Sequence, residues 1–579
     1  MDEDETTTAN TTRARSTYPR RRAVNACNAC RARRTKCDNR RPKCSFCERT
    51  GAACLRSTTD FSSFDPASLE ILDRLSRIEK ALLPPALSSP HPSHLREVVA
   101  EGYDSYMSNP EVDIDLFPQT LPKILAWPVL RPFTSPNWPV DVIYSPVASG
   151  NSASHPMAFP IETIADIDMK TCMALVDDYF NYNHIKNPIF DENAVRSTVK
   201  RVCFEGFARD ADSCLTLLVL ASGAISSPFD RELAPNGPSD TTLADALFDA
   251  AQKRVGFIFG QGNLLQAQCF FASGVFLMCK FRAYDAWKMF LQALAACQSF
   301  VCAGTPGTGP VDESNNESVL SERVYWSAWK SEREVRFELG LRDFGVSDLS
   351  HPGLYLTLPQ GGVEGPSLRS WYFYLSETAI WRLRVAARKA MMERAASHAS
   401  FDVTTLVPLS AHLEEQVVAW QESLTPSIAL GDLSRAAEET DILKYVLRGA
   451  ITNYYEMITW PFVVAAIHTE GQSQRVLECA TKGLEWHMNR LIINLPGFHH
   501  RHHGTWLMQQ SSSRSALILC AAALTAQTSR LLPPGWMRAV ERVGEMLRYW
   551  SPCVPTASDR AEVLEALLAR VGATTVDYT

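Results

Sequence analysis

Residues 27–54 read CNACRARRTKCDNRRPKCSFCERTGAAC. This stretch contains two copies of one spacing, C-x2-C-x6-C, joined by residues 38–43. It holds six of the sixteen cysteines of the 579-residue chain: Cys27, Cys30, Cys37, Cys44, Cys47 and Cys54. The repeated spacing indicates a metal-binding module, whereas the scattered cysteines elsewhere are typical of buried core residues in a reducing compartment.

Zinc is the metal that a site made only of cysteines favours, because four thiolates can surround it as a tetrahedron. Two separate zinc sites would need about eight thiolates, and six cysteines supply that many contacts only if two of them bridge both ions. We therefore expect two Zn2+ ions per chain. A single zinc leaves the doubled spacing unexplained, a disulfide framework requires an oxidising compartment, and a catalytic zinc requires an open coordination position.

The spacer between the second and third cysteine of each half is long enough for about two helical turns. In the first half the spacer 31–36 carries four basic residues, whereas in the second half the spacer 48–53 carries only Arg49. The halves therefore share a metal-binding frame but not a surface. The first half is the better candidate for contact with nucleic acid.

Basic charge is concentrated around this module. Residues 11–56 carry fourteen Arg or Lys against Asp38 and Glu48, a net charge of +12, and residues 1–10 carry −4. Because the whole chain carries −7, the segment from residue 57 onward carries −15. A basic module on an acidic body indicates a polyanionic partner for the first part only.

Neither a membrane segment nor a secretory signal is predicted. No stretch approaches the ~18 consecutive apolar residues of a membrane span, and residues 1–5 are mostly acidic, unlike a signal peptide. We expect an intracellular protein with no membrane partner.

From Ala26 to Arg56 the sequence resembles the binuclear zinc cluster domain of fungal transcription factors. The resemblance covers all six cysteines and includes Pro42 in the connecting loop, where this family usually has proline. It implies that Cys27 and Cys44 bridge the two zinc ions. It also implies that the helix of the first half enters the major groove of DNA at a CGG-type triplet.

The resemblance further implies a base contact by Arg34, three residues before the third cysteine. The family usually has lysine here, but an arginine can donate to guanine O6 and N7 together, which is worth about 1–3 kcal/mol of discrimination. Other basic side chains of the module are interpreted as phosphate contacts, which position the protein without reading the sequence: Arg31, Arg33, Lys36 and Lys43.

A short coiled-coil helix is predicted for residues 67–83, which the prolines at 84 and 85 end. Its apolar residues recur at steps of four, three and four: Ile71, Leu75, Ile78 and Leu82. With the leucines at heptad position a and the isoleucines at d, Arg74 and Glu79 take positions g and e and can pair across a parallel homodimer. The seam is about two heptads long, so a short helix packed on its own chain is the alternative.

Composition divides the remaining chain. Fourteen of the 34 prolines lie in residues 84–160, which predicts a linker, and we expect its one apolar patch, 124–130, to dock on the body. From residue 161 apolar residues recur at helical spacing nearly to the end. We therefore predict a mostly α protein with a disordered tail (1–22), a binuclear zinc cluster (23–56), a linker (57–66), the coiled-coil dimerisation helix (67–83), a proline-rich linker (84–160) and a large all-α regulatory region (161–579).

The predicted helical body resembles the middle homology region of the same regulators at 183–188, 265–271 and 325–332. That region is regarded as regulatory, and the resemblance transfers no residue as a ligand contact. Two other motifs are open to a metal interpretation, the acidic run 177–181 and the histidine run 499–503. We interpret the first as part of an ordinary helix and the second as a loop.

The sequence thus predicts a nuclear, zinc-dependent transcription factor rather than an enzyme, with an activating role in one pathway, such as a secondary-metabolite gene cluster. The expected partners are double-stranded DNA with CGG-type half-sites, a second copy of the chain and the transcription machinery. Nuclear import is assigned to Arg20, Arg21 and Arg22. Two alternatives stay open: a body that binds a small-molecule inducer while the zinc module only anchors it to DNA, and a repressor.

Overall fold

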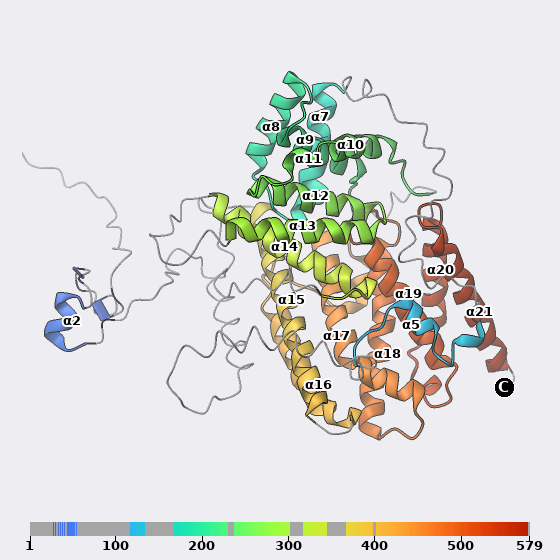
Figure 1. Cartoon of the computed structure of the whole chain (residues 1–579). Helices are drawn as coiled ribbons and strands as arrows, with labels where there is room; N and C mark the ends of the chain where they lie inside the picture. The colour runs from blue at the N-terminus through green and yellow to red at the C-terminus, as the bar shows by residue number, and fades with distance from the viewer. Residues whose placement is uncertain are drawn as a thin grey trace, which may run out of the picture. The chain divides into compact units, whose positions relative to one another are not determined.

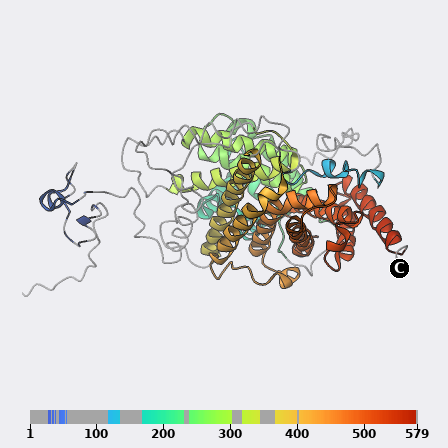
Figure 2. The same ribbon diagram turned by 90° about the horizontal axis from the view of Figure 1, so that it is seen from below.

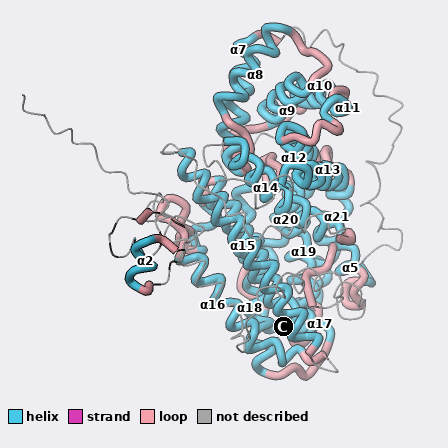
Figure 3. Tube along the Cα trace, turned by 60° about the vertical axis from the view of Figure 1, so that its left-hand side comes forward, coloured by secondary structure: helices cyan, strands magenta, loops and turns pink. Residues whose placement is uncertain are grey.

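A computed structural model describes the chain as two units, Met1–Pro84 and Pro85–Thr579 (Figure 1). In the second unit the described residues are 116–133, 167–229, 237–301, 316–343, 366–397 and 401–576. In the first unit they are the six cysteines of the module, residues 43–52, Ala29, Arg33, Thr35, Asp38 and Arg40. Helices and loops make up this described part and no strand occurs in it, which confirms the predicted mostly α fold (Figure 3).

The first unit contains a short helix, α2 (Ser45–Thr50), that starts at a cysteine. Cys44 caps its N-terminus, and the Cys44 Sγ accepts a hydrogen bond from the Cys47 N–H. Gly51 follows the helix with a φ of 65°, a left-handed conformation that favours glycine. Because Gly51 ends the helix, only the first three residues of the spacer 48–53 are helical, fewer than the two turns predicted for it.

Helices α7–α14 surround a first hydrophobic core. Their bounds are α7 Met169–Asp178, α8 Glu192–Glu205, α9 Ala211–Ile225, α10 Thr242–Gln252, α11 Val255–Ile258, α12 Leu264–Cys279, α13 Ala283–Val301 and α14 Asn316–Leu339. Helices α9 and α12 are buried at nearly every position, as helices without a polar face must be. Gly223 lets α9 approach α7 closely, because a Cβ there would lie 2.0 Å from the carbonyl oxygen of Leu175.

Helices α15–α21 complete the body, and α17–α21 surround a second hydrophobic core. Their bounds are α15 Pro366–Ala396, α16 Val407–Glu422, α17 Ile442–His468, α18 Gln474–Asn494, α19 Thr505–Ala523, α20 Trp536–Trp550 and α21 Thr556–Val576. Helix α17 packs beside α15, α16 and α18, and α19 is buried along nearly its whole length (Figures 1 and 2). No helix in the described ranges is both long and apolar enough to cross a lipid bilayer.

Residues 116–133, which we call the strap, pack on the body although they lie in the proline-rich span. The strap contains α5 (Leu121–Leu125), and four of its buried side chains belong to the second core: Leu121, Ile124, Trp127 and Leu130. The ring of Trp127 lies 6.0 Å from that of Trp460 and 4.6 Å from that of His468. The apolar patch at 124–130 is therefore part of the body's core rather than a solvated linker.

Candidate metal centre

The fold of the first unit brings all six cysteines of the module together. Their sulfur atoms form two groups of four, and within each group all sulfurs lie within 4.8 Å of one another. One group consists of Cys27, Cys30, Cys37 and Cys44, and the other of Cys27, Cys44, Cys47 and Cys54. Two thiols, those of Cys27 and Cys44, are common to both groups.

The spacing of the sulfurs suits tetrahedral zinc. The Cys27 Sγ lies 3.7 Å from the Cys44 Sγ and 3.5 Å from the Cys47 Sγ, and the Cys30 Sγ lies 3.5 Å from the Cys44 Sγ. A regular tetrahedron with Zn–S bonds of about 2.3 Å has S–S edges of about 3.8 Å. The domain therefore has the donor set and the spacing to hold two zinc ions, as its cysteine pattern predicts.

Local hydrogen bonds and burial set the proton affinity of these thiols. The Cys30 backbone N–H lowers the pKa of the Cys27 thiol to about 6, and the Cys47 backbone N–H likewise lowers the pKa of Cys44. Desolvation raises the pKa of Cys30 to about 12 and raises that of Cys47 as well. The two shared thiols are thus the ones most readily deprotonated, and a zinc ion ionises all the thiols that coordinate it.

The connection between the halves is fixed by an aspartate that we did not single out from the sequence. Asp38 accepts hydrogen bonds from the Ser45 N–H at 3.0 Å and from the Ser45 hydroxyl. These bonds hold the pKa of the Asp38 carboxyl below its usual range. They tie the start of the connecting loop to the first turn of α2. The sequence carries a signal for this role, because aspartate is one of the residues whose side-chain oxygens accept hydrogen bonds from the backbone N–H groups at the start of a helix.

The structure places some of the basic residues expected to contact DNA. Arg33 and Lys43 are exposed, and the Arg33 N–H donates to the Ala29 carbonyl oxygen at 3.2 Å, so a helical turn follows the first cysteine pair. Several predicted positions lie outside the described residues: Arg31, Arg34 and Lys36 of the module, Arg20, Arg21 and Arg22 of the tail, and Ile71, Arg74, Leu75, Ile78, Glu79 and Leu82 of the coiled coil.

The two other candidate metal motifs are not brought to a shared site. Among the described residues, the cysteine groups are the clusters whose ligand atoms lie close enough to share an ion. The acidic run instead supplies Asp177, whose Oδ1 lies 2.7 Å from the Arg196 Nη1. The histidine run is a partly buried loop, in which desolvation lowers the pKa of His500 to about 3 and Arg501 donates to the Cys279 carbonyl oxygen.

Comparison with known proteins agrees with this geometry. Residues 25–61 match the family described as "Fungal Zn(2)-Cys(6) binuclear cluster domain". A segment of 44 residues, 8% of this chain, is 50% identical to "Transcription factor FBD3" from Fusarium pseudograminearum (strain CS3096), of which it covers 6%. No solved structure matches the chain. The doubled spacing, the shared thiols and the family match together identify residues 25–61 as a fungal Zn(2)-Cys(6) binuclear cluster domain.

Proposed function

We propose that this protein is a zinc-dependent, sequence-specific DNA-binding transcription factor that acts in the nucleus. The observation that carries the proposal is the six-thiol centre, in which Cys27 and Cys44 belong to both groups of four. These two thiolates would bridge the zinc ions, and the other four cysteines would complete the two tetrahedra. No coordination position would remain open for water, so the metals hold the module together rather than catalyse a reaction.

The basic first half of the module would make the DNA contacts. Arg34 would read a guanine of a CGG-type triplet, because its fork matches guanine O6 and N7. Arg33 and Lys43 are exposed, as contact with phosphates requires. Arg31 and Lys36, on the same spacer, would add to this charge-based affinity, which falls as the salt concentration rises.

The rest of the chain would serve pairing and control. The helix predicted at 67–83 would pair two copies so that two modules read two triplets. The acidic helical body would transmit or restrain activation to the transcription machinery, as a middle homology region does, and Arg20–Arg22 would support import. The relative is named a transcription factor, which supports this role, and we propose an activator of one pathway's genes.

Selection of random DNA duplexes by the full-length protein tests the proposal. We expect the zinc-loaded protein to enrich paired CGG-like triplets, and enrichment to disappear when a chelator removes the metal. Arg34→Ala should relax the sequence preference, costing about 1–3 kcal/mol against the best site. Arg49→Ala is the matched control, because Arg49 is an exposed basic residue on the spacer of the second half.

Two results would contradict the proposal. Salt-sensitive binding with no enriched sequence would reduce the module to a nonspecific anchor. Sequence preference that survives complete removal of zinc would show that the thiol centre does not shape the DNA-reading surface.

A further inference from the structure

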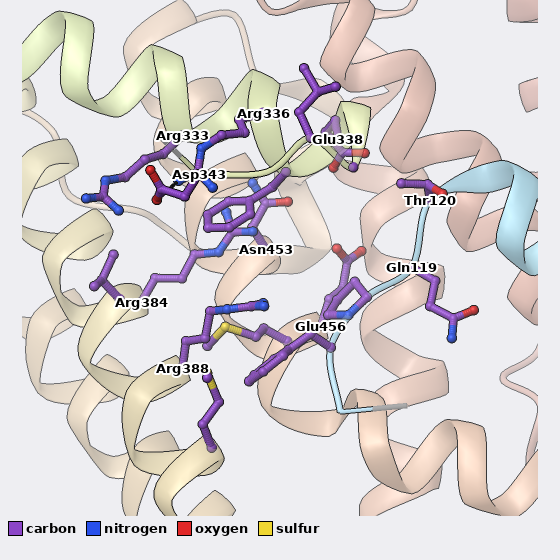
Figure 4. Close-up of a pocket in the computed structure, with 18 of the residues that line it drawn as sticks. Gln119, Thr120, Arg333, Arg336, Glu338, Asp343, Arg384, Arg388, Asn453 and Glu456 are labelled. Atoms are coloured by element: carbon purple, nitrogen blue, oxygen red, sulfur yellow. Dashed lines mark ion pairs between the residues drawn. The ribbon is translucent and has the colours of Figure 1, made fainter. Parts of the chain in front are cut away.

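A cavity of about 230 Å3 lies inside the helical body, and none of the functions proposed above uses it. Its walls come from α14, α15, α17 and α19 together with the strap (Figure 4). An apolar protein cavity of about 150 Å3 can hold benzene, so this one has room for a small ring with a polar substituent. The side chains that line it are unusually basic for the interior of an acidic body.

Acidic residues in the walls are already neutralised by basic partners. The Arg336 Nη2 lies 2.7 Å from Asp343 Oδ2, and the Arg514 Nη2 lies 2.6 Å from Glu338 Oε1. Glu456 is held by Arg490, which does not line the cavity. The fourth acid is Glu393, whose Oε1 lies 3.8 Å from the Nζ of Lys389 on the same helix. Since seven basic residues line the cavity against these four acids, positive charge is in excess there.

Arg384 lines the cavity and forms no ion pair with a carboxylate of the walls, although Glu334, Glu338 and Glu456 act on its charge from a longer distance. It is partly buried, and no ion pair or hydrogen bond joins its guanidinium to another described residue. Its charged group lies over the Trp381 ring, 4.8 Å from the centroid, and desolvation lowers its pKa. Arg388 lies one turn further along α15 and extends into the same space. Two like charges four residues apart on one helix destabilise that helix. A desolvated cation is costly unless an anion compensates it.

A second polar group stands across the cavity from these arginines. The Asn453 Oδ1 accepts a hydrogen bond of 2.6 Å from the Arg490 Nη2. With its oxygen engaged in this way, the amide nitrogen of Asn453 is the atom left to donate. Figure 4 shows Arg384 and Arg388 extending from α15 toward Asn453 and Glu456 of α17. A guanidinium fork and an amide N–H that converge on one space suit a carboxylate.

The remaining wall is apolar and partly aromatic. It includes Phe117 of the strap, Phe337 of α14 and Trp381 of α15, together with the flexible side chains Met392 and Met457. Aromatic and methionine side chains of this kind suit a flat apolar group. The cavity thus combines cationic groups with apolar side chains, and Arg384 and Arg388 lie over the aromatic rings. A mostly apolar lining with a few polar groups is usual in a site for a small organic molecule.

We propose that this cavity binds a small organic acid, with its carboxylate on Arg384 and Asn453 and its apolar part against the aromatic and methionine side chains of the wall. The ligand supplies the direct ion pair that Arg384 does not form with the walls, so it binds more tightly than a neutral molecule of the same shape. Its size is limited by the cavity to about one ring with a carboxylate or a short side chain.

The strap connects this site to the rest of the chain. Phe117 lies over Arg388, with the guanidinium carbon 3.7 Å from the ring centroid, and the Arg514 Nη1 donates to the Gln119 carbonyl oxygen at 3.4 Å. A bound acid therefore touches the segment that follows the zinc module in the chain. If the proposed transcription factor function holds, on which this step rests, the acid is an effector that fixes the strap on the body.

Calorimetry on the full-length, zinc-loaded protein tests the binding. The probes are benzoate, phenylacetate and 3-phenylpropionate, each compared with its own carboxamide. At least one acid should bind, at least tenfold more tightly than its amide, and Arg384→Gln should weaken that acid at least tenfold. Arg382→Gln is the matched control, because Arg382 is exposed on the same helix and does not line the cavity. Absence of binding by all three acids, or equal affinity in the Arg384→Gln protein, overturns the proposal.

Hydrogen exchange on the unmodified protein supplies a readout that does not depend on a variant folding. The bound acid should slow exchange of the backbone amides at 117–121, whereas the carboxamide should leave them unchanged. Exchange that is unaffected by a bound acid contradicts the proposed position of the ligand. DNA selection, run separately, reports on the proposed function, so failure of one experiment leaves the other result intact.

Discussion

The sulfur atoms of Cys27 and Cys44 lie 3.7 Å apart, and these two thiols are the pair that both four-sulfur groups share. Cys27 begins the first half of the module and Cys44 begins the second, so the same position of each copy of the repeat meets at the centre. In a centre of this kind, losing a shared thiol affects both ions, whereas losing an outer thiol affects one.

Zinc content should therefore depend on which cysteine is removed. We expect about two zinc ions per chain in the unmodified protein, about one in Cys37→Ala or Cys54→Ala, and nearly none in Cys27→Ala or Cys44→Ala. Mass spectrometry of metal in the purified protein measures this. Cys553→Ala is the control, because Cys553 is an exposed cysteine of the helical body. Equal zinc loss in all four module variants would argue against shared thiols.

Removing one member of the buried Glu456–Arg490 pair should destabilise the body strongly. The Arg490 Nε and Nη2 donate to the two carboxylate oxygens of Glu456 at 2.9 and 3.0 Å, and both side chains are buried. Glu456→Ala leaves a buried cation without its anion, which costs about 3–5 kcal/mol. Denaturant unfolding followed by circular dichroism measures the loss. The exposed pair formed by Lys482 and Glu414 is the control, and Glu414→Ala should cost less than about 1 kcal/mol.

Acidification should lower the free energy of unfolding of the helical body, because the body contains buried histidines. Desolvation lowers the pKa of His487 to about 4, and the nearby Arg514 and Arg490 act in the same direction while Glu456 opposes them. The unfolded chain, with a histidine pKa near 6.5, therefore binds more protons than the folded one between about pH 6.5 and pH 4. The free energy of unfolding should fall by about 2 kcal/mol for this group between pH 7 and pH 5.

Denaturant unfolding at the two pH values tests this dependence. His487→Gln should be less sensitive to pH than the unmodified protein, whereas His412→Gln, at an exposed position, should keep the full dependence. A slope that is unchanged in His487→Gln would show that other groups carry the acid sensitivity.

Two glycines in helices should respond in opposite ways to alanine. A Cβ at Gly223 would lie 2.0 Å from the backbone oxygen of Leu175, so Gly223→Ala must push α7 and α9 apart, which costs about 1–3 kcal/mol or more. At Gly544 in α20 a Cβ meets nothing within 4 Å, and alanine favours the helix by up to about 1 kcal/mol. Thermal unfolding of both variants measures the difference. A similar change in melting temperature for the two would exclude the close approach at Gly223 as the cause.

The sequence predicted most of the long helices because their apolar residues recur over many turns. The helical spacing of apolar residues continues through residues 443–467, which lie in α17, and residues 476–493, which lie in α18. Helices with a narrower apolar face give a weaker signal in the sequence. Helix α8 is an example, since its buried side chains are only Val195, Val199 and Val202.

Cysteine spacing predicted the six thiols that the fold brings together, because covalent distance along the chain limits which thiols can meet. The cavity could not be predicted in this way. Its residues come from segments as far apart in the sequence as Phe117 and Arg514. In the sequence alone, each arginine looks like an exposed residue on the surface of a helix. Only the packing of the helices shows that Arg384 lines a cavity without a direct ion pair.

The strap changes how a deletion experiment on this protein should be interpreted. A fragment beginning at residue 161, where the helical pattern starts, would lack Ile124, Trp127 and Leu130. Side chains of the same core, such as Trp460 and Val464, would then be exposed to water. Such a fragment should aggregate or be degraded, and the loss of activity would then report damage to the core. Mapping of an activating or inhibitory segment therefore requires fragments that retain residues 116–133.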